Sequence, residues 1–116
     1  MLPNRMNLSK TTEDQLKLLK QRTGISPNVS SRIAFFRSVE SGFRYAAESA
    51  KKLDGNLVLD KVTWLGETQL VTELVLKQTY PELDDKETMA AWAAHIEDGI
   101  AALRTHKNLL DFTNSL

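Results

Sequence analysis

The segment 86–104 constrains the fold more than any other part of this sequence, because it has the pattern of a helix with almost no polar side. Its apolar residues recur at helical spacing, and alanines fill most positions between them: Met89, Ala90, Ala91, Trp92, Ala93, Ala94, Ile96, Ile100, Ala101, Ala102 and Leu103. A helix that is apolar nearly all round is normally buried. A chain of 116 residues has little else with which to surround it. We therefore expect this helix to lie between copies of the chain. Two, four or more copies would all satisfy the apolar pattern; of these a tetramer is favoured, with a dimer as the alternative.

The N-terminal residues predict a short strand followed by a helix. Residues 5–9 alternate between polar and apolar side chains, which is typical of a half-buried strand. Thr12 and Gln15 have the spacing of a helix capping box, and Gly24 is a typical helix stop. These signals predict a helix over 12–22.

A second helix should begin almost at once. Ser26 is a favourable N-cap, and Pro27 suits the first helical position because its missing N–H would have no partner there. Apolar residues then keep helical spacing to about residue 42. Residues 57–64 are a short β-capable run, and we expect them to form an extended loop.

The C-terminal part predicts two more helices. Residues 67–79 form the first of them, which Tyr80-Pro81 ends because the residue before a proline avoids the α region. Asp84 or Asp85 then caps the apolar segment described above. The sequence therefore predicts a mainly α, four-to-five-helix small domain.

The strand and the first two helices together resemble the ribbon-helix-helix pattern, particularly in the turn from Gly24 to Asn28 with Ile33 further on. In that fold, two chains pair their strands into a ribbon that enters a DNA groove. The N-terminus of the second helix would offer N–H groups to a phosphate, and Ser26 and Asn28 would add side-chain donors. The alternative is that residues 1–9 are a disordered arm beside a plain helical hairpin.

Charge divides the chain into two halves, although the formal net charge is zero. Residues 1–52 hold ten lysines and arginines against four acids, whereas residues 53–116 hold five against eleven. A basic half favours a polyanionic partner, and neutralisation of one half by the other is the alternative. We interpret 1–116 as one domain with a basic, DNA-binding half at 1–52, an acidic helical half at 53–107 for packing and oligomerisation, and a frayed tail at 108–116.

Several classes of protein are excluded by composition. The chain has no cysteine, which excludes disulfides, thiolate nucleophiles and cysteine-ligated metal sites. No apolar run approaches the roughly 18 residues of a membrane span, and the N-terminus lacks the apolar stretch of a signal peptide. We expect a cytoplasmic protein with no membrane association.

The nucleophile and histidine patterns do not predict catalysis. His95 and His106 are the only histidines and would lie about 16 Å apart along a helix, too far to share a metal ion. We expect them to be surface or interface residues. Ser30 and Ser31 lack the sequence context of a serine nucleophile.

One acidic cluster could hold Mg²⁺, but helix capping explains it better. Its members lie where the N-terminus of a helix stabilises carboxylates: Glu82, Asp84, Asp85 and Glu87. We therefore expect no catalytic residue, no metal site and no cofactor, and do not expect an enzyme.

Two stretches of the chain carry a resemblance to a known family. Arg32-Ile33-Ala34 and Arg37-Ser38-Val39 lie in the second predicted helix, and Thr63-Trp64-Leu65-Gly66-Glu67 opens the third. With the overall pattern over residues 5–107, they resemble the DndE family, the small component of bacterial DNA phosphorothioation systems.

This resemblance implies a small, helical, self-associating protein. Such proteins act beside a cysteine desulfurase, an iron–sulfur protein and ATPase-like partners that place sulfur on the DNA backbone. The resemblance implies a DNA-binding accessory role with a preference for nicked duplex. The absence of cysteine agrees, because this chain cannot carry a persulfide.

The DNA-contacting residues are chosen on physical grounds, since lysine and arginine neutralise the phosphates of a duplex. Each candidate is individually also typical of a solvated surface charge. The candidates are Arg5, Lys10, Lys17, Lys20, Arg22, Arg32, Arg37, Lys51 and Lys52. For Arg32 and Arg37, pairing with Glu40 or with acids of the C-terminal half is the alternative. Besides Arg5 and Asn7, few side chains could read base edges, so we expect little sequence specificity.

Three functions follow from these observations. The first is a non-catalytic, homo-oligomeric DNA-binding accessory protein of phosphorothioate modification, acting with the other proteins of that machinery. The second is an assembly adaptor whose basic half docks acidic partner proteins. The third, an endonuclease that makes its own nicks, would need a metal cluster that the sequence does not offer.

Overall fold

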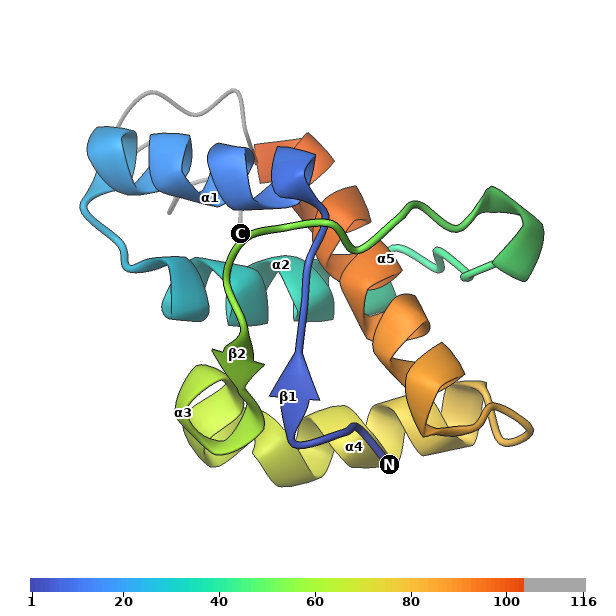
Figure 1. The fold of residues 1–116 in the computed structure, drawn as a ribbon. Helices are drawn as coiled ribbons and strands as arrows, with labels where there is room; N and C mark the ends of the chain where they lie inside the picture. The colour runs from blue at the N-terminus through green and yellow to red at the C-terminus, as the bar shows by residue number, and fades with distance from the viewer. Residues whose placement is uncertain (104–116) are drawn as a thin grey trace.

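The computed structural model describes residues 1–103, which form a mainly helical domain with a two-stranded sheet (Figure 1). The predicted tail at 108–116 and His106 lie outside the described residues. In chain order the elements are β1 (Arg5–Met6), α1 (Lys10–Thr23), α2 (Pro27–Glu40), η1 (Ala47–Ser49), β2 (Leu59–Asp60), α3 (Lys61–Leu65), η2 (Gly66–Thr68), α4 (Gln69–Thr79) and α5 (Asp85–Leu103).

Helix α5 is the centre of the core and packs mainly on α2. Its large side chains are almost fully buried by this one chain, with Trp92 and Ile96 at 1% and 0% exposure. Gly99 permits this packing, because a Cβ at that position would overlap the backbone of Ala34 on α2. The other helices of the same chain thus bury the large side chains of α5, whereas Ala101 and Ala102 at its end stay exposed. A second copy of the chain is therefore not needed to bury these large side chains.

Helix α1 begins earlier than its sequence pattern predicts. Ser9, not Thr12, is the N-cap, and its hydroxyl oxygen accepts from the N–H of Thr12 at 3.2 Å. The helix accordingly starts at Lys10 and not at residue 12. It ends as predicted at Gly24, whose φ of 77° lies in the left-handed region that favours glycine.

Strand β1 pairs antiparallel with β2 of the same chain, with Arg5 opposite Asp60 and Met6 opposite Leu59. Residues 57–64 therefore contain a strand and most of a short helix, and the extended loop predicted there is wrong. The pairing of β1 is satisfied within one chain, unlike the two-chain ribbon of the ribbon-helix-helix pattern. The buried side chains of Met6 and Leu59, 0% and 4% exposed, hold the pair against the core.

The start of the chain is held by a buried ion pair that joins α3 to α4. Lys61 Nζ lies 3.5 Å from Glu73 Oε2, with both side chains less than a tenth exposed. The N–H of Leu2 donates to Glu73 at 3.1 Å, and Lys61 donates to the carbonyl of Leu2 at 2.8 Å. These two hydrogen bonds hold Leu2, which precedes β1, against the first turn of α3.

The remaining helix boundaries agree closely with the sequence signals. Helix α2 starts after Ser26 as predicted and ends at Glu40. Helix α4 follows a turn of 3₁₀ helix and ends at Thr79, before the proline. Asp84 caps α5, since its Oδ1 accepts from the N–H of Glu87 at 2.8 Å.

Candidate nucleic-acid interface

The solvent side of α1 carries four of the candidate bases. Leu16 and Leu19 bury the other side of the helix, and residues three or four apart share a face. The exposed bases are Lys10, Lys17, Lys20 and Arg22. Lys10 Nζ is 3.0 Å from Asp14 Oδ1, and this hydrogen bond raises the pKa of Lys10. Within residues 1–103, Lys17 and Lys20 form no ion pair, so their charges face solvent unneutralised.

The end of α1 and the start of α2 lie at the same edge of the molecule (Figure 1). Lys20, in the last turn of α1, therefore lies at the same edge as the N-terminus of α2. The N–H groups and the dipole at that end of a helix favour an anion. Ser26 begins α2 as predicted, but its hydroxyl donates to Asn28 Oδ1 at 2.6 Å and forms no cap hydrogen bond. The expectation that the Ser26 hydroxyl is a free donor for phosphate is therefore wrong.

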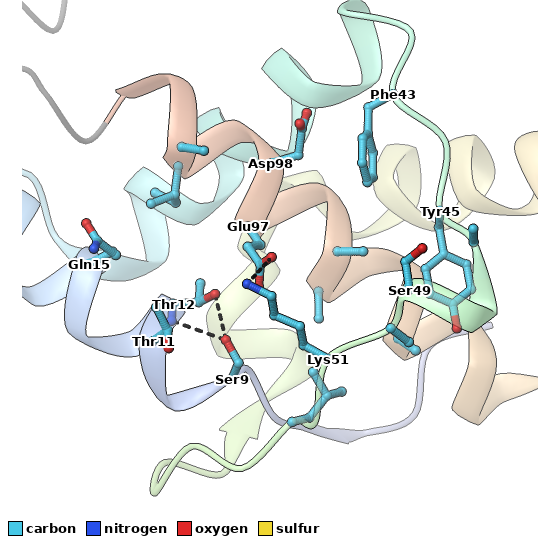
Figure 2. Close-up of a pocket in the computed structure, with 18 of the residues that line it drawn as sticks. Ser9, Thr11, Thr12, Gln15, Phe43, Tyr45, Ser49, Lys51, Glu97 and Asp98 are labelled. Carbon is cyan, nitrogen blue, oxygen red and sulfur yellow. Dashed lines mark hydrogen bonds and ion pairs between the residues drawn. The ribbon is translucent and has the colours of Figure 1, made fainter.

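Lys51 and Lys52 lie in the long segment that follows α2. Figure 2 shows the hollow of about 410 Å³ that this segment encloses with α1 and α5. Lys51 reaches across it, with its Nζ 3.0 Å from Glu97 Oε1 on α5, so much of its charge is neutralised. Lys52 is exposed. The N–H of Lys10 donates to Asp54 at 2.9 Å, which ties the segment to the first turn of α1.

Arg32 is held by the end of α3. Its Nε donates to the carbonyl of Trp64 at 2.9 Å, and Nη2 donates to the carbonyl of Thr63 at 3.3 Å. Gly66 follows with a φ of 53°, and a Cβ there would lie 2.7 Å from Nη2. The guanidinium of Arg32 thus binds backbone carbonyls at the end of α3. The alternative expectation for Arg32 was an ion pair with an acidic side chain, and these carbonyls take that place. Its role in the fold is to join α2 to α3.

The two remaining candidates lie on other elements. Arg5 is exposed on β1, directly opposite Asp60 in the strand register. Arg37 is half-buried on α2, where it lines a shallow hollow with Arg32 and Glu40. The structure thus gathers four of the nine candidates on α1, places two more in the segment beside its first turn, and sets Arg5, Arg32 and Arg37 apart.

A buried carboxylate that the sequence pattern does not reveal shapes the segment after Lys52. Glu13 is 3% exposed and accepts from the N–H groups of Asn56 and Leu57 at 3.2 and 2.9 Å. Gly55 passes so close that a Cβ would overlap this carboxylate. Glu13 occupies a position in α1 typical of a solvated acid, so no local signal marks it.

His95 lies in the core, and the expectation of a surface or interface histidine is wrong. Tyr80 Oη is 2.7 Å from its Nε2, and Ser38 Oγ is 2.9 Å from its Nδ1. Ser38 donates to Asp98 at 2.8 Å, and Tyr80 accepts from the N–H of Tyr45 at the same distance. Because the hydroxyl hydrogen of Ser38 is directed to Asp98, the Nδ1–H of His95 donates to Ser38. The hydroxyl of Tyr80 donates to Nε2, so His95 has one donor and one acceptor nitrogen, as a neutral imidazole does.

The surroundings of His95 favour that neutral form. Burial lowers the pKa of His95 to about 4, with Arg44 acting in the same direction and Asp98 opposing it. At neutral pH this side chain therefore carries no positive charge. Its hydrogen bonds join α2, α4, α5 and the segment after α2.

The acidic cluster at the start of α5 makes structural contacts. Asp84 caps the helix, and Asp85 Oδ1 lies 3.2 Å from the ammonium group of Met1. Among residues 1–103, no three histidine or acidic side chains are placed to hold a metal ion together. The described helices also include none with the length and hydropathy needed to cross a membrane.

Comparison with known proteins identifies the family. The family model for the DNA sulphur modification protein DndE matches residues 5–111. A crystal structure of DndE from Escherichia coli B7A, described as involved in DNA phosphorothioation modification, is 70% identical and covers 89% of this chain and 99% of its own, with a TM-score of 0.84. A mutant DndE, also described as involved in DNA phosphorothioation, is 67% identical over 88% and 98%, with a TM-score of 0.83. No curated protein matches the sequence. This chain belongs to the DndE family of DNA sulphur modification proteins.

Proposed function

We propose that this chain is a non-catalytic DNA-binding accessory protein of DNA phosphorothioate modification, acting in the cytoplasm beside the other proteins of that machinery. Its similarity to a DndE described as involved in that modification supports the pathway. The single observation that supports DNA binding is the exposed face of α1, where Lys17 and Lys20 carry unneutralised charge among the described residues.

The contact we propose is to the phosphate backbone. Lys17 and Lys20 are three residues apart, so they lie on neighbouring positions of one helix surface. The N-terminus of α2 at the same edge adds N–H groups that suit a phosphate oxygen. Lysine binds phosphate as a point charge and carries no base pattern, so binding should be nearly independent of sequence. The preference for nicked duplex is supported by the family resemblance alone.

A salt titration tests this proposal. Labelled intact and singly nicked duplexes are titrated with the protein at several salt concentrations, and affinity should fall steeply as salt rises. Lys17→Ala and Lys20→Ala should each weaken binding to every duplex and reduce the salt slope by about 1. Lys86→Ala is the matched control, because Lys86 is an exposed lysine on α5, away from α1. The proposal fails if no duplex binds at low salt, or if the control weakens binding as much as the α1 variants.

The adaptor function remains the second candidate because two of the candidate lysines are already paired with acids, Lys10 with Asp14 and Lys51 with Glu97. This leaves a smaller positive surface than the sequence suggests, and such a surface also suits an acidic protein. Absence of DNA binding together with salt-sensitive binding to an acidic partner of the machinery would favour the adaptor.

We also propose that the chain self-associates, with a tetramer favoured and a dimer as the alternative. The family resemblance supports this proposal, and the large side chains of α5 are already buried within one chain.

A further inference from the structure

The hollow between α1, α5 and the segment after α2 has the size of a small-ligand site. Its volume of about 410 Å³ lies within the roughly 300–1,000 Å³ that is typical of such sites. The side formed by α5 consists almost entirely of small side chains, which leave this space open. These residues are Ala90, Ala93, Ala94, Ile100 and Ala101.

The aromatic side of the hollow is held in place by contacts with the core. The ring of Phe43 meets His95 edge to face, with 5.1 Å between centroids, and the ring of Tyr45 meets Tyr80 in the same way at 6.2 Å. The N–H of Tyr45 also donates to Tyr80 Oη at 2.8 Å. Both rings lie on the same side of the hollow (Figure 2). The hollow is therefore bordered by two fixed aromatic rings before any ligand enters it.

Polar groups with spare hydrogen-bonding capacity lie across the hollow from these rings. Figure 2 shows Gln15 of α1 on the side opposite Phe43 and Tyr45, with Lys51 and Glu97 between them. Within residues 1–103 the amide of Gln15 has no hydrogen-bond partner, so it can both donate and accept. The side chains of Lys51 and Glu97 are 61% and 35% exposed, so their ion pair is a weak surface pair that a ligand can displace.

The charges of the hollow select the class of ligand. Two cations, Arg44 and Lys51, and two carboxylates, Glu97 and Asp98, line it, so their charges cancel. A phosphate would meet as much repulsion as attraction there. A nucleobase fits these surroundings, because it is planar and neutral, stacks on aromatic rings, and both donates and accepts hydrogen bonds at its edge.

We propose that this hollow binds a nucleobase that has left the base stack, with its face against the two aromatic rings and its edge towards Gln15 and the Lys51–Glu97 pair. This inference rests on the proposed DNA binding for the source of the base, and it adds an uncharged contact to the phosphate contacts. Lys10 and Lys52 are exposed and adjoin residues that line the hollow. A strand whose phosphates they contact therefore passes close to it.

Two duplexes that differ by one unpaired adenine test the binding of a base from DNA. The duplex with the bulged adenine should bind about tenfold more tightly than the fully paired duplex at the same salt concentration, because stacking of one base adds to the phosphate contacts. The salt slopes for the two duplexes should be equal, because a contact with a base neutralises no phosphate.

Filling the hollow should remove the preference for the bulged duplex. Ala94→Leu places a larger side chain in the hollow, so the two duplexes should then bind equally, with the affinity for the paired duplex unchanged. Ala102→Leu is the matched control, because Ala102 is an exposed alanine of α5 that does not line the hollow. Circular dichroism checks that each variant keeps its helix content.

A second variant tests the polar side and leaves α5 unchanged. Gln15→Ala should reduce the preference for the bulged duplex about threefold, because one hydrogen bond to the base is lost. Gln21→Ala is its control, since Gln21 is an exposed glutamine of α1 that does not line the hollow. This pair remains decisive if Ala94→Leu disturbs the packing of α5.

Free adenosine tests the hollow without DNA. Its addition should shift the NMR signals of the methyl groups of Ala90, Ala93 and Ala94, and leave that of Ala102 unchanged. Gln15→Ala should weaken the binding of adenosine by about the same threefold factor, because the same hydrogen bond is lost.

The outcomes separate this inference from the proposed DNA binding. Failure of every duplex to bind at low salt would overturn the DNA proposal, and adenosine would still test the hollow. Shifts with adenosine but no preference for the bulged duplex would support a base site that takes a free nucleoside and overturn DNA as its source. A preference for the bulged duplex that both Ala94→Leu and Gln15→Ala abolish or reduce would support DNA as the source. A preference that both variants leave intact, or neither adenosine shifts nor a preference, would overturn the inference.

Discussion

Acidification should destabilise this protein through His95. The imidazole is 1% exposed and hydrogen-bonded at both nitrogens by Ser38 and Tyr80. Burial lowers its pKa in the folded state to about 4, from an ordinary 6.5. Because the folded pKa is depressed, the unfolded chain takes up a proton at a higher pH than the folded one. The neutral histidine's contribution to stability is therefore complete above about pH 6.5 and is lost as the pH falls toward 4.

The size of the effect follows from the two pKa values. Between pH 7 and pH 5 the difference in proton uptake should lower the free energy of unfolding by about 2 kcal/mol. A proton on Nε2 would also face the hydroxyl hydrogen of Tyr80, so that hydrogen bond would have to rearrange. Urea unfolding followed by the fluorescence of Trp64 and Trp92 measures the change at each pH.

His95→Gln provides the comparison, because glutamine is polar but does not titrate. Asp54 and Asp60 stay ionised over this range, because backbone hydrogen bonds lower their pKa values from the ordinary 3.8, and they affect both proteins alike. The original protein should therefore lose about 2 kcal/mol more than the variant on going from pH 7 to pH 5. Parallel losses in the two proteins would refute the reasoning, whatever their absolute stabilities.

Two further substitutions test the packing that the fold depends on. Gly99→Ala should lower the free energy of unfolding by about 3 kcal/mol, because the new methyl group overlaps the backbone of Ala34 and the two helices must separate; unchanged urea unfolding would show that α5 can shift without cost. Lys61→Met should cost about 3 kcal/mol at pH 7, because it leaves the carboxylate of Glu73 buried without its partner. Adding Glu73→Gln should recover part of that loss in the same assay, and a double variant less stable than the single one would contradict this explanation.

The helices are the part of the fold that local signals predict well. Ser26 and Pro27 start α2, Gly24 ends α1 and Asp84 caps α5, as the sequence indicates. Each of these signals acts within one turn of its own helix, so its effect does not depend on the rest of the chain. The one displaced start, at Ser9 in place of Thr12, arises because two neighbouring hydroxyls can both serve as caps.

The elements that the sequence does not predict depend on distant partners. Strand β2 has two residues and exists because Leu59 pairs with Met6, far earlier in the chain. Residues 57–64 alone contain too few contacts to favour a strand over a loop. Dependence on distant partners also explains the burial of Lys61. Its sequence context is typical of a surface lysine, and only in the folded chain do Glu73 and the carbonyl of Leu2 contact it.

The candidate site shows the same division. Positive charge in the first half is a property of composition, and counting residues is enough to find it. Which bases remain available depends on their neighbours in space. Arg32 binds carbonyls at the end of α3 and Lys51 binds Glu97, whereas Lys17 faces solvent.

By itself, the sequence determined a mainly helical domain without cysteine, most of its helix ends, its uneven charge and its resemblance to the DndE family. Only the tertiary structure decided that the large side chains of α5 are buried by its own chain, that His95 is buried and neutral, and which of the lysines and arginines are paired. The physical reason is that caps and periodicity act between residues a few positions apart. Burial and ion pairing depend on which surfaces meet when distant segments pack, and an apolar pattern does not specify its own partner.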